Sequence, residues 1–126
     1  MKKKKEEHHV YVVTKYKTAM PKGGTAAERN RLLSQFFKQV TKKNNKIVGS
    51  KTLVHYYGSD ARDWVIINEY KTWADIEEAD KISQKLMKKK WPSDKKRRQF
   101  FRQIGKYFSG YEHSDEIYID MPMFRK

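Results

Sequence analysis

The first periodic segment of the chain is the run at residues 10–17, Val-Tyr-Val-Val-Thr-Lys-Tyr-Lys. β-Branched and aromatic residues dominate it, which is typical of a strand. Residues 20–24 then contain one Pro and two Gly, which break regular structure. The pattern predicts a first strand that is followed by a loop.

A helix is predicted next. Residues 25–28, Thr-Ala-Ala-Glu, have the spacing of a capping box, in which Thr25 caps the helix and Glu28 reaches back to the cap. Apolar side chains then recur at i, i+3, i+4 and i+7, which is one stripe of an amphipathic helix. The stripe consists of Leu33, Phe36, Phe37 and Val40. We expect this helix to end near Asn44 and Asn45.

The middle of the chain predicts a β-hairpin. Residues 47–57 form a second strand, residues 58–63 a polar turn and residues 64–70 a third strand. Trp64 to Ile67 are apolar on both faces, and strands of this kind are covered on both sides. One layer of helices covers only one face, so this strand favours pairing with a second subunit.

Two further helices and a last strand complete the pattern. Thr72 to Asp75 begin a helix with the stripe Ile76, Ala79, Ile82, Ser83 and Leu86, and Trp91-Pro92 ends it. Ser93 or Asp94 caps the next helix, whose stripe is Phe100, Phe101, Ile104, Tyr107 and Phe108. Residues 116–121 form the last strand, before Pro122. The sequence therefore predicts an α+β domain of order β-α-β-β-α-α-β with a four-stranded antiparallel sheet.

Composition fits one folded domain. A chain of 126 residues suits a single domain, and its 13% of aromatic residues is unlike a disordered chain. Apolar residues make up only 37%, so burial of one face against a second subunit would help the core. We expect a basic disordered tail at residues 1–8 and a single domain at residues 9–126.

The element order is similar to the ferredoxin-like split β-α-β plan. With the aromatic hairpin at residues 55–70 and the Trp73-Ala74-Asp75-Ile76 that follows it, the chain resembles the dimeric α/β-barrel superfamily over residues 9–121. That superfamily includes antibiotic-biosynthesis-type monooxygenases, haem-degrading enzymes and stress-responsive barrel proteins, and the resemblance is to its small bacterial members. It implies a two-fold dimer, in which two sheets face each other as a barrel with the helices outside.

The resemblance also implies a pocket between sheet and helices in each subunit. Haem-degrading members use an Asn, a Trp and a His there. Asn68, Trp64 and His55 are of these types, but they do not match the motif positions, so no catalytic role is carried over from that family.

The residues themselves suggest a pocket at the hairpin. Alternation places Trp64, Asn68 and Tyr70 on one face of the third strand, and His55 and Tyr57 on one face of the second. Hairpin register decides whether the two sets share a face. Polar tips on aromatic bodies suit a flat, partly apolar ligand, and His55 is the natural acid or base. The candidate ligand-binding residues are Tyr16, Tyr57, Trp64, Asn68 and Tyr70.

The first functional hypothesis is a homodimeric barrel protein that binds a small molecule. It is either a binder or an oxygenase-like or isomerase-like enzyme without a cofactor. In the enzyme His55 is catalytic, Tyr57 and Asn68 orient the substrate and Trp64 forms an apolar wall. The alternative interpretation is that these residues are core and interface aromatics with satisfied polar tips.

Charge supports a second hypothesis. The net charge is +14, and residues 81–106 carry eleven Lys or Arg against one acid. Several of these cations begin the third helix, where the helix dipole opposes them, so an anionic partner is indicated. The contacts would be Lys95, Lys96, Arg97, Arg98 and Arg102, with Trp91 and Phe100 stacking on bases of a nucleic acid. A solvated basic face, or an engineered or structural protein without a native ligand, would show the same charge.

Other chemistry has little support. The chain has no Cys, so disulfides and thiolate metal sites are excluded. His113 and Glu116 have a spacing that would suit metal ligands on one helix face, but this segment is predicted as a loop that enters the last strand, and no metal site or cofactor is expected. No run approaches the roughly 18 apolar residues of a membrane span. The basic start lacks the apolar stretch of a signal peptide, so we expect a cytoplasmic protein, or one exported after a leader is removed.

Overall fold

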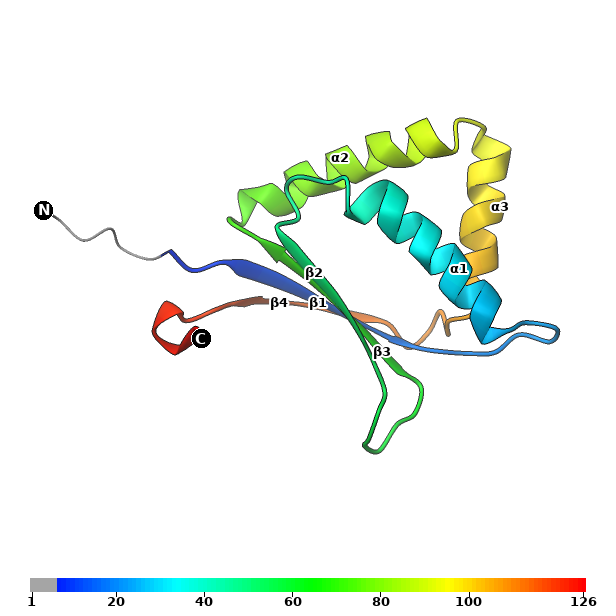
Figure 1. Ribbon diagram of the computed structural model, residues 1–126, viewed down its shortest axis with the longest axis horizontal. Coiled ribbons are helices and arrows are strands. Elements are labelled where there is room, and N and C mark those ends of the chain that lie inside the picture. The colour runs from blue at the N-terminus through cyan, green and yellow to red at the C-terminus, as the bar shows by residue number, and fades with distance from the viewer. Residues whose placement is uncertain (1–6) are drawn as a thin grey trace, which may run out of the picture.

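The computed structural model describes residues 7–126. Its sheet has four antiparallel strands in the order β2-β3-β1-β4. The strands are β1 (Val10–Lys17), β2 (Gly49–Val54), β3 (Asp63–Tyr70) and β4 (Ser114–Ile119). The helices are α1 (Ala26–Phe36), α2 (Ala74–Lys90) and α3 (Asp94–Gly105), and all three lie on one side of the sheet (Figure 1). This is the split β-α-β plan that the sequence predicts, with one extra helix. Most of the expected tail at residues 1–8 lies outside the described residues.

Pairing between strands fixes which side chains share a face. Tyr16 pairs with Trp64, and Trp64 pairs with Val54, so these three lie on one face. That face carries the side chains nearest the helices, and we call it the helix face. Side chains one residue out of step, such as Val13, Val65 and Ile67, lie on the other face, which no helix covers (Figure 1). We call this the open face.

Helix starts agree with the caps that the sequence indicates. Thr25 Oγ1 accepts from Glu28 N at 3.1 Å, and Ser93 Oγ accepts from Lys96 N at 3.3 Å. Glu28 does not reach back to the cap directly. Its carboxylate instead accepts from the Tyr107 hydroxyl at 2.8 Å, and that hydroxyl accepts from Thr25 N at 3.2 Å. The buried Tyr107 therefore joins the end of the α3 segment to the start of α1.

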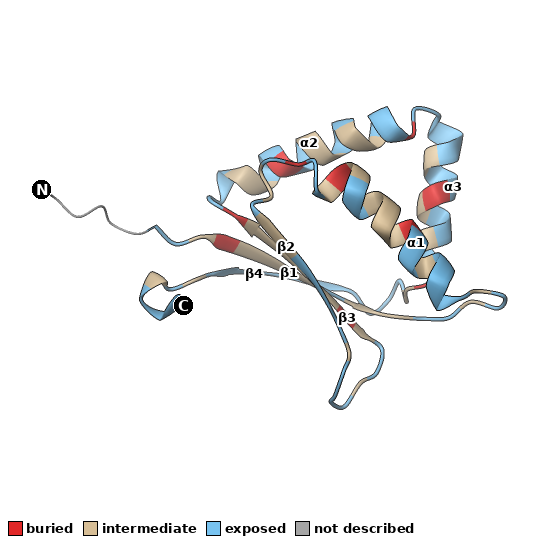
Figure 2. Ribbon diagram, viewed as in Figure 1, coloured by how far each residue is buried: buried red, intermediate tan, exposed pale blue. Residues whose placement is uncertain are grey.

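The main core lies among the helices rather than on the sheet (Figure 2). Its buried members are Leu32, Val40, Trp91, Phe100 and Tyr107. Trp91 stacks on Phe100 with ring centroids 4.1 Å apart. A buried Asn44 fastens the connection before β2 to α2, because its side-chain amide donates to Ala79 O at 2.8 Å and to Ser83 Oγ at 2.9 Å.

Three predicted boundaries were wrong. The first helix does not continue as a regular α-helix to Asn44, because a π-helical segment occupies Phe37–Thr41. The second strand ends at Val54 rather than at residue 57, since the following residues form the turn around Gly58, whose φ is +140°. The last strand ends at Ile119 rather than at residue 121, and a single 3₁₀ turn over Pro122–Phe124 follows it.

Candidate functional site

A cavity of about 390 Å³ lies between the helix face of the sheet and helices α1 and α3. Tyr16, Trp64 and Ile66 line it from the sheet, and Leu33 and Phe36 from α1. The α3 side and the segment before β4 supply Phe101, Ile104, Gly105, Phe108, Ser109, Gly110 and His113. The volume and the mainly apolar lining with a few polar groups are typical of small-molecule pockets.

The polar groups of this cavity gather around Tyr16. The His113 ring stacks on the Tyr16 ring, with centroids 4.8 Å apart and planes 15° from parallel. His113 Nε2 lies 3.2 Å from Asp115 Oδ2, and Asp115 also accepts from the Thr14 hydroxyl at 2.7 Å. Burial, followed by the charge of Asp115, raises the pKa of Tyr16, so its phenol keeps its proton and remains a donor.

Trp64 is the second polar feature of the wall. It is only 8% exposed, and no acceptor for its Nε1–H lies within hydrogen-bonding distance among residues 7–126. Phe108 packs edge-on against its ring at 5.7 Å, and Arg29 Cζ lies 5.0 Å from the ring centroid. A buried donor without a partner is costly, so this indole lowers the stability of the fold.

A smaller hollow of about 240 Å³ shares five lining residues with the cavity, including Tyr16 and Trp64. Its other walls include Asn68 and Thr52 from the sheet and Phe37 and Thr41 from the π-helical segment. Ser50 Oγ donates to Asn68 Oδ1 at 2.6 Å, which holds that amide in place. Short π-helices often occur at functional sites, and the π-helical segment Phe37–Thr41 contributes Phe37 and Thr41 to the wall of this hollow.

The structure separates the residues that the sequence grouped at the hairpin. Tyr16 and Trp64 line the cavity, and Asn68 lines the adjoining hollow. Tyr70 is buried near Val10, with which it pairs, and lines neither space. Burial raises the pKa of Tyr70, as expected for a phenol inside the fold. Tyr16, Trp64 and Asn68 therefore lie at two adjoining spaces, and Tyr70 lies outside both.

His55 and Tyr57 line neither of these two spaces. His55 N donates to Asp63 O at 3.3 Å, and Asp63 belongs to the open-face set, so the register directs His55 away from the Trp64 face. With Leu53 and Val65, the two residues border a shallow hollow, and Tyr57 is 96% exposed. His55 also borders a hollow of about 350 Å³ together with Trp64 and Arg29, and this hollow is separate from the cavity of about 390 Å³.

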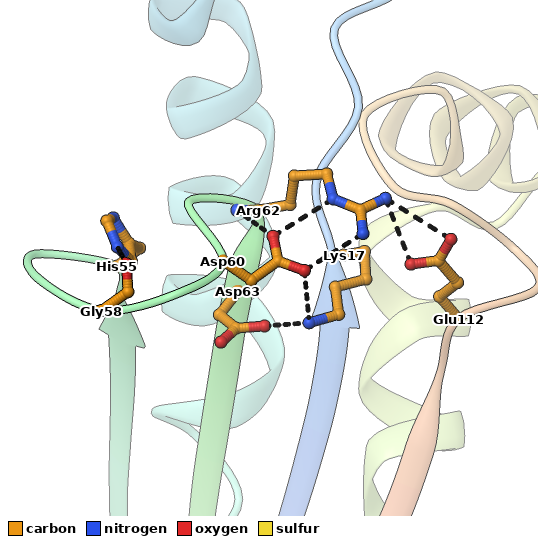
Figure 3. A network of polar contacts seen from close by, with 7 residues as sticks. All are labelled: Lys17, His55, Gly58, Asp60, Arg62, Asp63 and Glu112. Carbon is orange, nitrogen blue, oxygen red and sulfur yellow. Dashed lines mark hydrogen bonds and ion pairs between the residues drawn. The ribbon is translucent and has the colours of Figure 1, made fainter.

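A network of ion pairs holds the hairpin turn beside the cavity wall (Figure 3). Asp60 Oδ1 accepts from Arg62 N at 2.9 Å. Asp60 Oδ2 accepts from Arg62 Nη2 at 3.1 Å and lies 3.1 Å from Lys17 Nζ. These bonds, those from Arg62 first, hold the pKa of Asp60 well below its usual value. Lys17 also contacts Asp63, and Arg62 reaches Glu112 at 3.2 Å. The network therefore links the turn to the residue that precedes His113.

The basic segment differs in part from its prediction. Lys95, Lys96, Arg98 and Arg102 are exposed and form no ion pair with an acid among residues 7–126. Arg97 instead forms contacts within the fold, because it donates to Trp91 O at 2.8 Å and pairs with Asp94. Trp91 and Phe100 are buried in the helical core, so the expectation that they stack on bases was wrong.

Two further properties bear on the site. Among residues 7–126, no three His, Asp or Glu side chains gather as metal ligands would. No helix in the same part of the chain is long and apolar enough to cross a membrane.

Comparisons with known proteins gave results only for structures. No family model and no curated protein matches the chain. A NIPSNAP family protein from Agrobacterium tumefaciens matches with a TM-score of 0.63 at 12% identity, over 94% of this chain and 91% of that one. SnoaB, a cofactor-independent oxygenase from Streptomyces nogalater, matches with a TM-score of 0.52 at 9% identity, over 87% and 90%. A dimeric protein of unknown function and ferredoxin-like fold from Bacteroides fragilis matches with a TM-score of 0.50 at 8% identity, over 87% and 94%.

At these identities the likeness concerns the fold alone. The neighbours are ferredoxin-like proteins, and the strand order, the three helices on one side and the antiparallel sheet agree with them. The chain therefore has a ferredoxin-like α+β fold, as the sequence predicts.

Proposed function

We propose that this chain is a homodimeric barrel protein that binds a small, largely apolar molecule between its sheet and helices α1 and α3. The observation that carries the proposal is the cavity of about 390 Å³, whose mainly apolar wall contains Tyr16, Trp64 and His113. An ordinary core would fill such a space with side chains. Here the buried core lies among the helices, and the helix face of the sheet is left partly uncovered.

The open face supports the homodimer. Val13, Val65 and Ile67 lie there in the middle of the sheet, and no helix covers them (Figure 1). Central apolar side chains on both faces of a strand are typical of a sheet that is packed on both sides. A second copy of the chain would cover this face, and one structural neighbour is described as dimeric.

His113 is the acid or base that the geometry favours for a ligand in the cavity. It lines the space, it stacks on Tyr16, and the Asp115 carboxylate lies against its Nε2. A carboxylate beside one ring nitrogen orients the imidazole ring. His55, the catalytic residue proposed from the sequence, stays a prediction, and its ring nitrogen contacts Gly58 O at 3.2 Å in the turn (Figure 3).

Titration with Nile red tests the binding site. This uncharged probe avoids the general attraction of anions to a chain of net charge +14. We expect saturable binding with one probe per chain. Leu33→Trp, which adds an indole to the cavity wall, should abolish it, and Met20→Trp should not, because Met20 is exposed and outside the cavity. Equal binding by the two variants, which gain the same fluorophore, would place the probe elsewhere.

A second candidate function is polyanion binding through residues 85–102. It is supported by four exposed cations that form no ion pair within residues 7–126, namely Lys95, Lys96, Arg98 and Arg102. Affinity for single-stranded DNA should then fall steeply with salt, and reversing the charge of Lys95, Lys96 and Arg98 should remove it. Affinity that survives the triple change would exclude this surface.

A further inference from the structure

One row of side chains crosses the open face of the sheet. Lys51 on β2 pairs with Ile67 on β3, Ile67 pairs with Val13 on β1, and Val13 pairs with Glu116 on β4. The row therefore reads cation, apolar, apolar, anion from one edge of the sheet to the other. Its two apolar members are half-buried, while Lys51 and Glu116 are exposed.

The two charges of this row form no ion pair among the residues that the structure describes. Lys51 has no acidic partner among residues 7–126, and Glu116 only accepts a hydrogen bond from the Tyr118 hydroxyl. They cannot pair with each other, because three strand spacings of about 4.8 Å separate β2 from β4. The row thus has charges of opposite sign, one at each edge of an uncovered apolar strip.

A two-fold axis parallel to the strands reverses this row. If two open faces meet about such an axis, β2 of one chain faces β4 of the other, and rows at the same height meet. Lys51 then faces Glu116 of the partner subunit, and Ile67 faces the partner's Val13. A two-fold axis in the sheet plane but perpendicular to the strands would instead place each edge on the same edge of the partner, with like charges near each other.

The geometry points to a homodimer whose two-fold axis runs parallel to the strands and whose two edges are closed by Lys51–Glu116 ion pairs between subunits. This inference rests on the proposed homodimer and adds its symmetry axis and the residues that set its register. The neighbouring rows agree with it. Glu69 would face the partner's Tyr11, and Val65 the apolar stem of the partner's Lys15, so no like charges meet in either row.

Charge exchange between the edges tests the axis. Lys51→Glu and Glu116→Lys each place two like-charge pairs in the dimer, so each should weaken self-association by at least about tenfold in sedimentation velocity at low salt. The double variant restores both pairs and should dimerise as wild type does. An equal mixture of the two single variants should form heterodimers, because every pair across that interface is again opposite in charge.

Matched controls separate this effect from net charge. Lys88→Glu changes the net charge by the same amount as Lys51→Glu but lies on α2, away from the open face, and should leave association unchanged. A carbodiimide, which joins amines to carboxylates without a spacer, should link Lys51 to Glu116 in the dimer. The separation of the two residues within one chain means that this peptide pair, found by mass spectrometry, must come from two subunits.

The outcomes distinguish the inference from the proposed function. The inferred axis is supported if each single variant self-associates weakly, the double variant dimerises as wild type does, and the mixture of single variants forms heterodimers. A wild-type dimer whose single variants associate equally well overturns the axis and leaves the homodimer standing. A wild-type chain that stays monomeric overturns both.

Discussion

The His113 ring lies stacked on the Tyr16 ring, with centroids 4.8 Å apart, although 97 positions separate the two residues in the chain. The contact joins the segment before β4 to the end of β1, at the wall of the cavity between the sheet and helices α1 and α3. Among the histidines of residues 7–126, His113 is the one that lines this cavity. The stack therefore identifies the polar side of the proposed binding site.

Replacing His113 and His55 one at a time should show whether the probe binds in the cavity or at the hairpin. His113→Ala removes the stacked ring, so the free energy of unfolding should fall by about 0.5–1.5 kcal/mol and Nile red should bind more weakly. His55→Ala should change neither, because His55 lies outside the cavity. Urea unfolding and probe titration measure both effects. If only His55→Ala loses Nile red binding, the binding site lies at the hairpin and not in the cavity.

Trp64→Phe tests the unpartnered indole. The change removes a buried donor that has no acceptor, which offsets part of the lost ring area, so we expect the free energy of unfolding to change by less than about 1 kcal/mol. Trp91→Phe removes part of a ring that stacks on Phe100 in the core, and should cost about 1–3 kcal/mol. Thermal unfolding compares the two. A larger loss at Trp64 would show that its N–H is satisfied in solution.

Asn44→Ala should destabilise the fold through the connection that precedes β2. The buried amide donates to Ala79 O and Ser83 Oγ and accepts from Lys46 N at 3.1 Å, so its loss should cost about 1–3 kcal/mol. The adjacent Asn45 is exposed and offers a matched control, for which we expect a change within about 0.5 kcal/mol. Equal denaturation midpoints for both variants would contradict the role given to Asn44.

Asp60 should contribute to acid sensitivity. Its pKa is lowered from 3.8 in the folded chain by Arg62 and Lys17, so the unfolded chain takes up this proton first as the pH falls. The stabilisation is present above pH 4 and is lost below it, and wild type should lose stability between about pH 5 and 2. Asp60→Asn should show a smaller loss over that range, and Asp80→Asn, an exposed control, the full loss. Identical pH profiles for Asp60→Asn and wild type would remove Asp60 from this effect.

Local patterns predicted the elements well where burial agreed with them. The segments at residues 10–17 and 64–70 are rich in β-branched and aromatic residues and lie in the middle of the sheet. Their sequences therefore predict strands, as the structure has them. The caps at Thr25 and Ser93 are local hydrogen bonds that follow from residue type and spacing. The predicted second strand was too long because it included Tyr56 and Tyr57. Aromatic residues favour strands, but these two lie exposed in the turn.

The site was less predictable because it depends on register and on distant contacts. The length of the β2–β3 turn decides whether His55 or Val54 shares the face of Trp64, and that length is not fixed by residue type. Nothing near His113 in the sequence indicates that Tyr16 lies beside it. The π-helical segment at Phe37–Thr41 likewise had no local signal that distinguishes it from a regular helix.

Native mass spectrometry of the wild-type chain with Nile red tests the homodimeric binding protein most directly, since it reports subunits and bound probe together. We expect a species of two 15.1-kDa chains that carries two probe molecules. A single chain, or a dimer that carries no probe, would contradict the account.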